Sequence, residues 1–464
     1  MKKFNLEVSV LKNIVDNLLL FKSGSNACVF RIGTKVASED KLQSSVTIVN
    51  GGTQSEIAFF AVTPADYEPL ENNGVAVPYV TFACKADAFT SVANALLAYE
   101  ESITISVDGN KVALAANTKA NVEIPLVAED DLEATLPSVP KNGPIVAVQG
   151  KADSFMSIAK KGAFLRNDKC QHHVGDRVVI ELVGADKISA YSTNSFAFAA
   201  ATANVQTKYN IPQLAMFRLR LMAEKLKDEE KASFEQEVKA QMQDTTGKQL
   251  VEFAKGKGVS LDRFAFSLLH TSFFIMKKLI STCEMFKIAV TDNYCYLMAG
   301  NVMATFTLGN TVPTVVQQAV VNFTRPSASD SVVVDCNVLQ KGLAVLSLIG
   351  AEGKKTVSPS FVEVSSEGLK LTKKGSSVLS PYIEKKGSGT SKCFLDAELL
   401  KETVSSLDSG NVVFTFREGV GVPVEIRNGS LADNATSLAF ILQVDPNKVA
   451  TEEKSGSDET DSES

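Results

Sequence analysis

The chain has 464 residues, of which 45% are hydrophobic and 22% are charged, as in ordinary soluble globular domains. This composition excludes a wholly disordered, collagen-like or coiled-coil protein, and at roughly 100–200 residues per domain the length predicts about three domains. The formal net charge is −6, and the segment Thr451–Ser464 alone holds six acidic residues and one lysine. The body is therefore nearly neutral, which excludes a globally basic nucleic-acid-binding protein but permits a locally basic face.

We find no uncharged apolar run long enough to span a membrane and no signal-peptide pattern at the start of the chain. The seven cysteines are widely spread and odd in number, which is typical of reduced, buried thiols rather than of a disulfide framework. We therefore expect a cytoplasmic protein with no membrane partner.

Most of the chain is predicted to form short strands. β-Branched or alternating runs bounded by Gly, Asn, Asp or Ser are typical of strands. Such runs occur at Val46–Val49, Ile57–Val62, Ile103–Val107, Lys111–Ala115, Arg177–Leu182 and Val412–Phe416. Asp108, Gly109 and Asn110 join two of these runs, and they predict a hairpin turn because residues of this kind tolerate positive φ.

Helical patterns are short, and they recur. One set follows a strand at Ser9–Phe21, Ala152–Phe164 and Cys336–Ile349; a second set precedes a strand pair at Lys85–Leu97, His270–Cys283 and Asp396–Leu407. Strand, helix and several strands therefore occur twice in a unit that appears three times. The pattern predicts an α+β protein with three repeated domains at 1–139, 140–328 and 329–447, followed by an acidic, disordered tail at 448–464.

The second unit contains a segment, about 211–258, that fits no strand pattern. Leu214, Phe217 and Leu221, and then Phe234 and Val238, fall at helical spacing around a charged run. We expect a helical hairpin or a long helix inserted in the second domain. It is either a decoration packed on one sheet or a dedicated partner-binding arm.

A search for catalytic or metal-binding motifs finds no convincing candidate. Cys170 with His172 and His173 invites a zinc interpretation, but adjacent histidines on a strand point to opposite faces and no second ligand pair follows. The segment 350–356 lacks the glycine spacing of a phosphate loop. Asp130 and Asp131 lie in a segment that is typical of a connector. We therefore expect no enzyme activity, no metal and no cofactor.

Lysines recur on the predicted helices of all three units. With the neighbouring Arg166, they are Lys12, Lys85, Lys160, Lys161, Lys277, Lys278, Lys341 and Lys401. If the helices lie on the concave side of each unit, these cations lie together on that side. They can contact the phosphates of a nucleic acid, and such contacts carry no sequence information. The alternative for any one of them is a solvated helix face.

Five segments match the local patterns of one family in order. They are MKKFNLEVSVLKNIVDNL, ISVDGNKVALAANTKANVEIPLVAEDDLEATLP, KISAYSTNSFAFAAATANV, TFTLGNTVPTV and VEIRNGSLADNATSLAFILQV. They resemble the opening strand and helix, the end of the first domain, a partner-binding loop, the second linker and the closing strands of the bacterial-type DNA sliding clamp, the beta subunit and processivity factor of the replicative polymerase. The resemblance covers about residues 1–447.

The resemblance implies a clamp fold in which each domain has two inner helices and outer antiparallel sheets. It further implies a homodimeric ring around duplex DNA, bound without sequence specificity, with a DNA polymerase and a clamp loader attached through short peptide motifs. The implied DNA-facing residues are the basic residues given above. The implied ring interface pairs Val122 and Ile124 of the first domain with Leu346, Leu348 and Ile349 of the third.

The implied partner-peptide groove is formed by Val174, Thr193, Ser195, Phe196, Phe198, His270, Phe274, Phe440, Ile441, Leu442 and Val444. The alternative for Phe196, Phe198 and Phe440 is an ordinary hydrophobic core. Thr193 matches the family loop, whereas Phe196 and Ala197 stand where the family has His and Arg, and the chain end lacks the family's Met-Pro-Met stretch. These departures indicate a divergent version, compatible with a phage origin. The rival functions are a β-rich structural or assembly protein of phage type and an enzyme on a β-rich scaffold.

Overall fold

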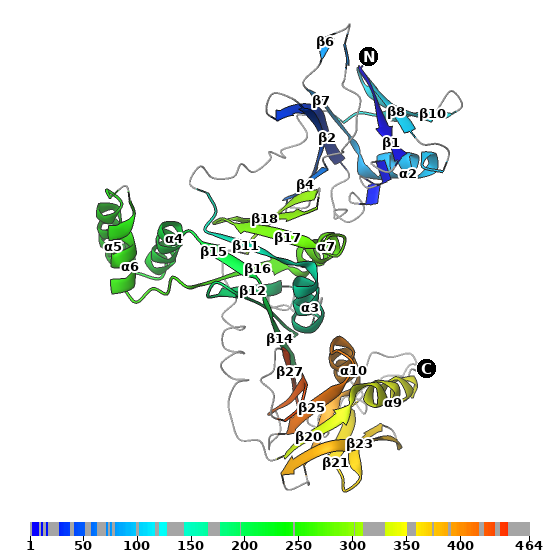
Figure 1. Ribbon diagram of the computed structural model, residues 1–464, viewed down its shortest axis with the longest axis vertical. Helices are drawn as coiled ribbons and strands as arrows, with labels where there is room; N and C mark the ends of the chain where they lie inside the picture. Colours follow the sequence, from blue (N-terminus) through cyan, green and yellow to red (C-terminus); the bar gives the residue numbers. More distant parts are fainter. Residues whose placement is uncertain are drawn as a thin grey trace, which may run out of the picture. The chain divides into compact units, whose positions relative to one another are not determined.

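The computed structural model describes most of the chain (Figure 1). The described residues are 2–8, 11–12, 15–16, 27–37, 41–51, 57–62, 71–72, 75–76, 79–98, 102–116, 120–127, 143–165, 177–194, 196–244, 246–300, 302–309, 330–349, 359–373, 375–387, 391–416, 422–431 and 437–443. Of the residues discussed above, the ones outside these ranges are Asp130, Asp131, Arg166, Cys170, His172, His173, Val174, Ser195, Val444, the segment 350–356 and the acidic tail. The helix predicted at Ser9–Phe21 also lies outside them, except for Leu11, Lys12, Val15 and Asp16.

The chain divides into two compact units. One comprises Met1–Asp153, Val205–Phe264 and Thr271–Asn310, and the other comprises Ser154–Asn204, Ala265–His270 and Thr311–Ser464. This division cuts through the middle one of the three domains expected from the sequence, because a nine-stranded and a twelve-stranded sheet each contain strands from two neighbouring expected domains. The three-domain boundaries stay a prediction.

The first unit contains a nine-stranded sheet and a four-stranded sheet. The nine strands lie in the order β15 (Gln206–Tyr209), β11 (Val146–Lys151), β17 (Met285–Val290), β18 (Tyr294–Ala299), β19 (Val302–Thr307), β4 (Ile57–Val62), β3 (Lys41–Gly51), β2 (Ala27–Ala37) and β7 (Tyr79–Lys85). The four strands are β1 (Lys2–Glu7), β8 (Ser102–Asp108), β9 (Lys111–Ala116) and β10 (Ala120–Pro125). Helices α2 (Ala86–Leu96) and α7 (His270–Ile280) each precede a strand pair, β8 and β9 or β17 and β18, as the sequence predicts. The unit also contains a short strand pair, β5 (Glu71–Asn72) and β6 (Val75–Ala76).

The second unit is built on a twelve-stranded sheet. Its order is β16 (Arg263–Leu269), β12 (Arg177–Val183), β13 (Lys187–Thr193), β14 (Ala197–Asn204), β27 (Ser437–Leu442), β26 (Pro423–Asn428), β25 (Asn411–Phe416), β20 (Asp330–Asp335), β23 (Ser376–Gly387), β22 (Gly368–Lys373), β21 (Pro359–Val364) and β24 (Lys392–Asp396). Every strand register given for the described residues is antiparallel, as expected for an α+β protein.

Helices α9 (Cys336–Leu348) and α10 (Ala397–Ser406) pack against each other on one face of this sheet (Figure 1). Both begin at an aspartate: Asp335 accepts a hydrogen bond from the Val338 amide at 2.9 Å, and Asp396 accepts one from the Leu399 amide at 2.7 Å. Such caps satisfy backbone donors that have no partner inside the helix. Buried side chains of both helices, among them Leu343 of α9, form one core with the inward-facing side chains of the sheet.

Close packing between α9 and the sheet depends on Gly342. A Cβ atom at this position would clash with the side chain of Val378 on β23. Glycine therefore lets the helix approach the strand to a distance that a larger residue would prevent.

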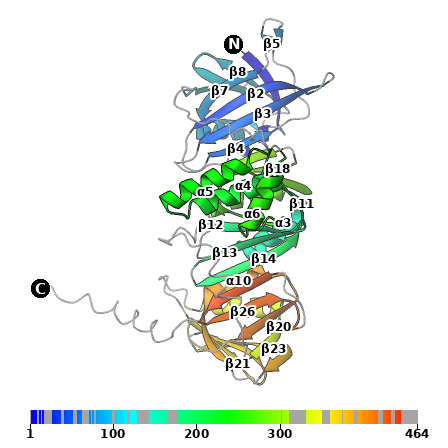
Figure 2. The ribbon, with the colours of Figure 1, turned by 90° about the vertical axis from the view of Figure 1, so that its left-hand side faces the viewer.

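The segment 211–258, for which we expected a helical insertion, holds three helices, α4 (Ile211–Ala223), α5 (Asp228–Gln241) and α6 (Lys248–Gly256). They lie side by side in both views and share a small core that includes Leu219, Phe234 and Leu250 (Figures 1 and 2). The Phe217 ring of α4 lies against the ring of Phe264, which follows the module in the chain, with the two centroids 5.5 Å apart. None of the helices in the described parts of the chain has both the length and the apolar character that crossing a membrane requires.

Candidate nucleic-acid interface and partner-binding surface

Helix α7 carries two lysines and no acidic residue. Its buried residues include Phe273, Met276 and Ile280, so the helix packs on one side and presents the other to solvent. Phe274 is 53% exposed, and the Lys278 ammonium lies 5.3 Å from the centroid of its ring. A cation over an aromatic face is held in place without losing its charge. This face of α7 can therefore attract phosphate groups.

Two of the expected DNA-facing lysines, at the end of helix α3 (Ala152–Gly162), also serve a structural role. Lys160 donates a hydrogen bond to the Leu407 carbonyl at 3.0 Å and lies 3.5 Å from Asp408. The Lys161 side chain is only 11% exposed and forms an ion pair with Asp408. Burial by itself would raise the pKa of Asp408, but the ammonium groups of Lys161 and Lys160 outweigh it and lower this pKa below 3.8. Lys161 is therefore largely engaged within the chain, and its expected contact with DNA stays a prediction.

The surface of α9 and α10 is of mixed charge. Lys341 is exposed, while Lys401 donates a hydrogen bond to the Ser347 hydroxyl at 3.0 Å and so links the two helices. Acidic residues lie among these lysines: burial first, and then the carboxylates of Asp396 and Glu398, raise the pKa of Glu402. Phosphate binding on this surface would depend on few cations.

The remaining expected cations, Lys12 and Lys85, are exposed. Lys85 occupies the position before α2, whose first turn contains Asp87. An acidic residue at this end is favourable for the helix dipole, but it offsets the lysine. Of the described helices that carry the expected cations, α7 and α9 contain no acidic residue, and α7 has two lysines where α9 has one.

The expected partner-peptide groove divides into exposed and buried residues. Thr193 and Asn194 form the turn between β13 and β14: the Thr193 hydroxyl donates to the Ala197 carbonyl at 2.7 Å, and the Asn194 side chain accepts from the Ala197 amide at 2.9 Å. This turn leaves Phe196 64% exposed. The Leu442 amide donates to the Phe196 carbonyl at 2.9 Å, which places the end of β27 beside the turn. Phe196 and half-buried Leu442 thus form an apolar surface.

Other expected groove residues belong to the core. Phe198 and Phe440 are 3% and 2% exposed and pack together, while Ile441 is fully buried in the core beneath α9 and α10. For these three residues the groove expectation is wrong, because alternate residues of β14 and β27 point into packed layers on the two faces of the sheet. His270 is half-buried at the start of α7, and Phe274 is described above.

The expected ring interface is corrected in the same way. Val122 on the edge strand β10 is 39% exposed and Leu348 at the end of α9 is 77% exposed, so both can contact a second chain. Ile124 and Leu346 are each 2% exposed and lie in the cores of their own units. Ile349 is partly buried against the same core as Leu346. The two buried residues cannot form the interface without unfolding.

Chemistry-bearing clusters are scarce in the described part of the chain. It contains no group of three or more His, Cys, Asp or Glu side chains placed to hold a metal ion. Cys84, Cys295, Cys336 and Cys393 are buried thiols. Burial raises the pKa of Cys393 to about 12, which keeps this thiol protonated and poorly nucleophilic at neutral pH.

Long antiparallel sheets that continue from one repeat into the next, with helix pairs packed on a face, define the DNA sliding-clamp fold. Over 96% of its length the chain is similar to the beta subunit of DNA polymerase III from Thermotoga maritima, with a TM-score of 0.68, 10% identity and 100% of that chain covered. The sliding clamps of Pseudomonas aeruginosa (TM-score 0.68, 10% identity, 96% of this chain and 100% of that one) and Bacillus subtilis (TM-score 0.68, 13% identity, 96% and 99%) are similar to the same extent.

No family model matches the sequence, and no curated protein matches it. The likeness therefore lies in the fold, at an identity of 10–13% in these three comparisons. The predicted fold class, an α+β clamp fold, is confirmed.

Proposed function

We propose that the chain is a DNA sliding clamp, a processivity factor that closes as a ring of two chains around duplex DNA and tethers a DNA polymerase. The observation that carries this proposal is the clamp fold over 96% of the chain. A ring acts by topology, so it needs no catalytic residue. A near-neutral body with phosphate-attracting helices fits this mode of action, because phosphate contacts hold the duplex without stopping movement along it.

In this proposal Lys277 and Lys278 of α7 supply the strongest phosphate contacts, with Lys12, Lys85, Lys160, Lys341 and Lys401 as weaker ones. Val122 and Leu348 contribute apolar side chains to the ring interface. Polymerase and loader peptides dock on the surface formed by Phe196 and Leu442, where exposed apolar anchors supply affinity. This surface has lost the charged residues that the family places there, so it favours apolar peptide side chains.

Topological binding can be tested without knowing the loader. Diluted, dissociated chains are mixed with a nicked circular plasmid and concentrated so that rings close around the DNA, and the complex is isolated by gel filtration. The protein should co-elute with the circle and should be released when a restriction enzyme linearises the plasmid at constant salt. Light scattering of the free protein should give the mass of two chains.

The control for topology uses the same plasmid linearised before mixing, because rings slide off the ends of linear DNA. Equal retention on circular and linear DNA would indicate ordinary electrostatic binding and would contradict the clamp proposal. Failure to co-elute with the circle, in a sample that is dimeric by light scattering, would favour the structural or assembly function instead.

A further inference from the structure

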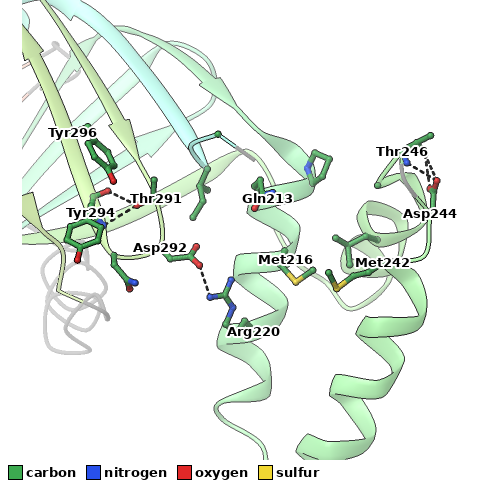
Figure 3. A pocket seen from close by; sticks show the side chains of 16 residues that line it. Gln213, Met216, Arg220, Met242, Asp244, Thr246, Thr291, Asp292, Tyr294 and Tyr296 are labelled. Atoms are coloured by element: carbon green, nitrogen blue, oxygen red, sulfur yellow. Dashed lines mark hydrogen bonds and ion pairs between the residues drawn. The ribbon is translucent and has the colours of Figure 1, made fainter. Parts of the chain in front are cut away.

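A cavity of about 800 Å³ lies between helix α4 of the insertion and the turn that joins β17 to β18 (Figure 3). Met216 of α4 and Met242, the residue that ends α5, lie on one side of it, and Tyr294 and Tyr296 of β18 lie on the other. Methionine and tyrosine are suited to such a surface, because flexible thioethers and amphipathic rings adapt to different apolar ligands. The lining of the cavity therefore combines these apolar side chains with polar ones, which include Gln213, Thr246 and Asn293.

The charged side chains of this cavity are occupied within the chain. Arg220 and Asp292 form an ion pair at 2.6 Å across it (Figure 3). The Asp244 carboxylate accepts hydrogen bonds from the Thr246 and Gln249 amides at 2.9 and 3.1 Å, and its bonds to Thr246 are the main cause that lowers its pKa to about 2. The Arg220–Asp292 pair is neutral as a whole, whereas Asp244 stays ionised, so these three side chains give this half of the site a single negative charge.

A second hollow, of about 530 Å³, lies on the adjoining face of the nine-stranded sheet. Its floor is set by the strand register: Ala147 of β11 lies directly between Lys208 of β15 and Ala289 of β17, and Ala289 pairs in turn with Tyr296. Residues paired in this way lie on one face of a sheet. Two adjacent alanines leave a space there that a large side chain can fill.

The two hollows adjoin, because Thr291 and Tyr296 line both of them, and we call the pair of hollows the groove. The hollow over the nine-stranded sheet, the sheet half of the groove, differs in charge from the cavity beside α4, the helical half. Lys208 and Lys287, on the strands that flank β11, are exposed, and in the described part of the chain neither has an ion pair. The Thr207 hydroxyl, which also lines this half, is buried without a hydrogen-bond partner among the described residues.

We propose that this groove binds an extended segment of a partner protein in which a large apolar side chain, flanked by carboxylates, lies over Ala147 and Ala289. The carboxylates pair with Lys208 and Lys287, and a second apolar side chain of the same segment contacts Met216 and Met242. The helical insertion is then a partner-binding element, because it supplies one wall of the groove. The proposal does not require that the chain encircle DNA.

The test selects ligands without a prior choice of sequence. A phage-displayed library of random dodecapeptides is panned against the full-length protein, and selected peptides are synthesised with a fluorescein label and measured by fluorescence anisotropy. We expect selected sequences with an apolar residue between acidic ones. Their affinity should fall at least about tenfold in the double variant Lys208→Glu/Lys287→Glu, as for the loss of central interface contacts, and similarly in Ala147→Tyr, which fills the hollow.

Two control variants make the outcome specific. Lys187→Glu reverses an exposed strand lysine outside the groove, and Phe196→Ser alters the separate surface proposed for polymerase peptides. Both should leave the affinity unchanged, and thermal melting should show that the groove variants are folded. The proposal is overturned if panning selects no peptide, if selected peptides bind the groove variants with unchanged affinity, or if their binding is lost in Phe196→Ser.

Discussion

Phe198 of β14 and Phe440 of β27 lie directly opposite each other, and their ring centroids are 6.4 Å apart. Tyr191 of β13 stacks on Phe198 at 6.0 Å, and Val179 completes the cluster. The β14–β27 pair is the place where strands from distant parts of the sequence join into the twelve-stranded sheet. The packing of these aromatic rings therefore adds to the backbone hydrogen bonds that hold β14 and β27 together at this junction.

Replacing Phe198 with alanine should destabilise the second unit strongly. Truncation of a buried phenylalanine removes apolar contacts and leaves a cavity, at a cost of about 3–5 kcal/mol. Differential scanning calorimetry should show a clearly lower melting temperature for Phe198→Ala. Phe196→Ala is the matched control and should melt with the wild type, because its ring is 64% exposed. Equal melting temperatures for the two variants would contradict the buried position of Phe198.

Asp408 should contribute stability that disappears in acid. Its pKa is lower in the folded chain than its ordinary value of 3.8, so the carboxylate favours folding above that value and the contribution is lost as the pH falls through the folded-state pKa. Asp408→Asn should therefore cost about 1 kcal/mol at neutral pH, as expected for a largely exposed ion pair. Urea unfolding of the wild type and of Asp408→Asn between pH 7 and about pH 3 should show that the difference in their free energies of unfolding shrinks at the acidic end. A difference that is constant with pH would mean that the ion pairs with Lys160 and Lys161 are not its source.

Reversal of the α7 cations should weaken DNA binding without loss of the fold. We expect Lys277→Glu/Lys278→Glu to be retained less on circular plasmid, with a smaller dependence on salt, since fewer counterions are released per complex. Lys225→Glu/Lys227→Glu is the charge-matched control on the helical insertion, where both lysines are exposed. Equal loss of retention in the two variants would point to net charge rather than to α7.

Self-association should depend on the exposed members of the expected interface. Leu348→Asp and Val122→Asp place a charge in an apolar contact between chains and should shift the protein toward a single-chain mass in light scattering. Neither should change the melting temperature of the isolated chain, since both side chains are exposed. Met285→Asp, at a similarly exposed methionine, is the control and should leave the mass unchanged. Ile124→Asp gives no information on the ring, because a charge at this buried position should unfold its own unit.

Much of the architecture follows from the sequence alone. The periodicity of apolar residues placed the starts of α3, α7 and α9 at Ala152, His270 and Cys336, where the structure has them. It could do so because a helix and a strand differ in period, and that difference is local. The threefold recurrence of helices and strands then limited the possible topologies, and the order of the local motifs indicated a clamp.

Which side chains are free for function was decided only by the tertiary structure. Phe196 and Phe198 are two residues apart with the same chemistry, yet one is exposed in a turn and the other is buried against Phe440, which lies more than two hundred residues away in the chain. Lys161 is committed to Asp408 for the same reason, since their separation in the sequence gives no sign of their contact. The groove over Ala147 and Ala289 depends on strand register, and register is set by contacts between distant segments. Local patterns determine elements, whereas burial and pairing depend on how those elements pack.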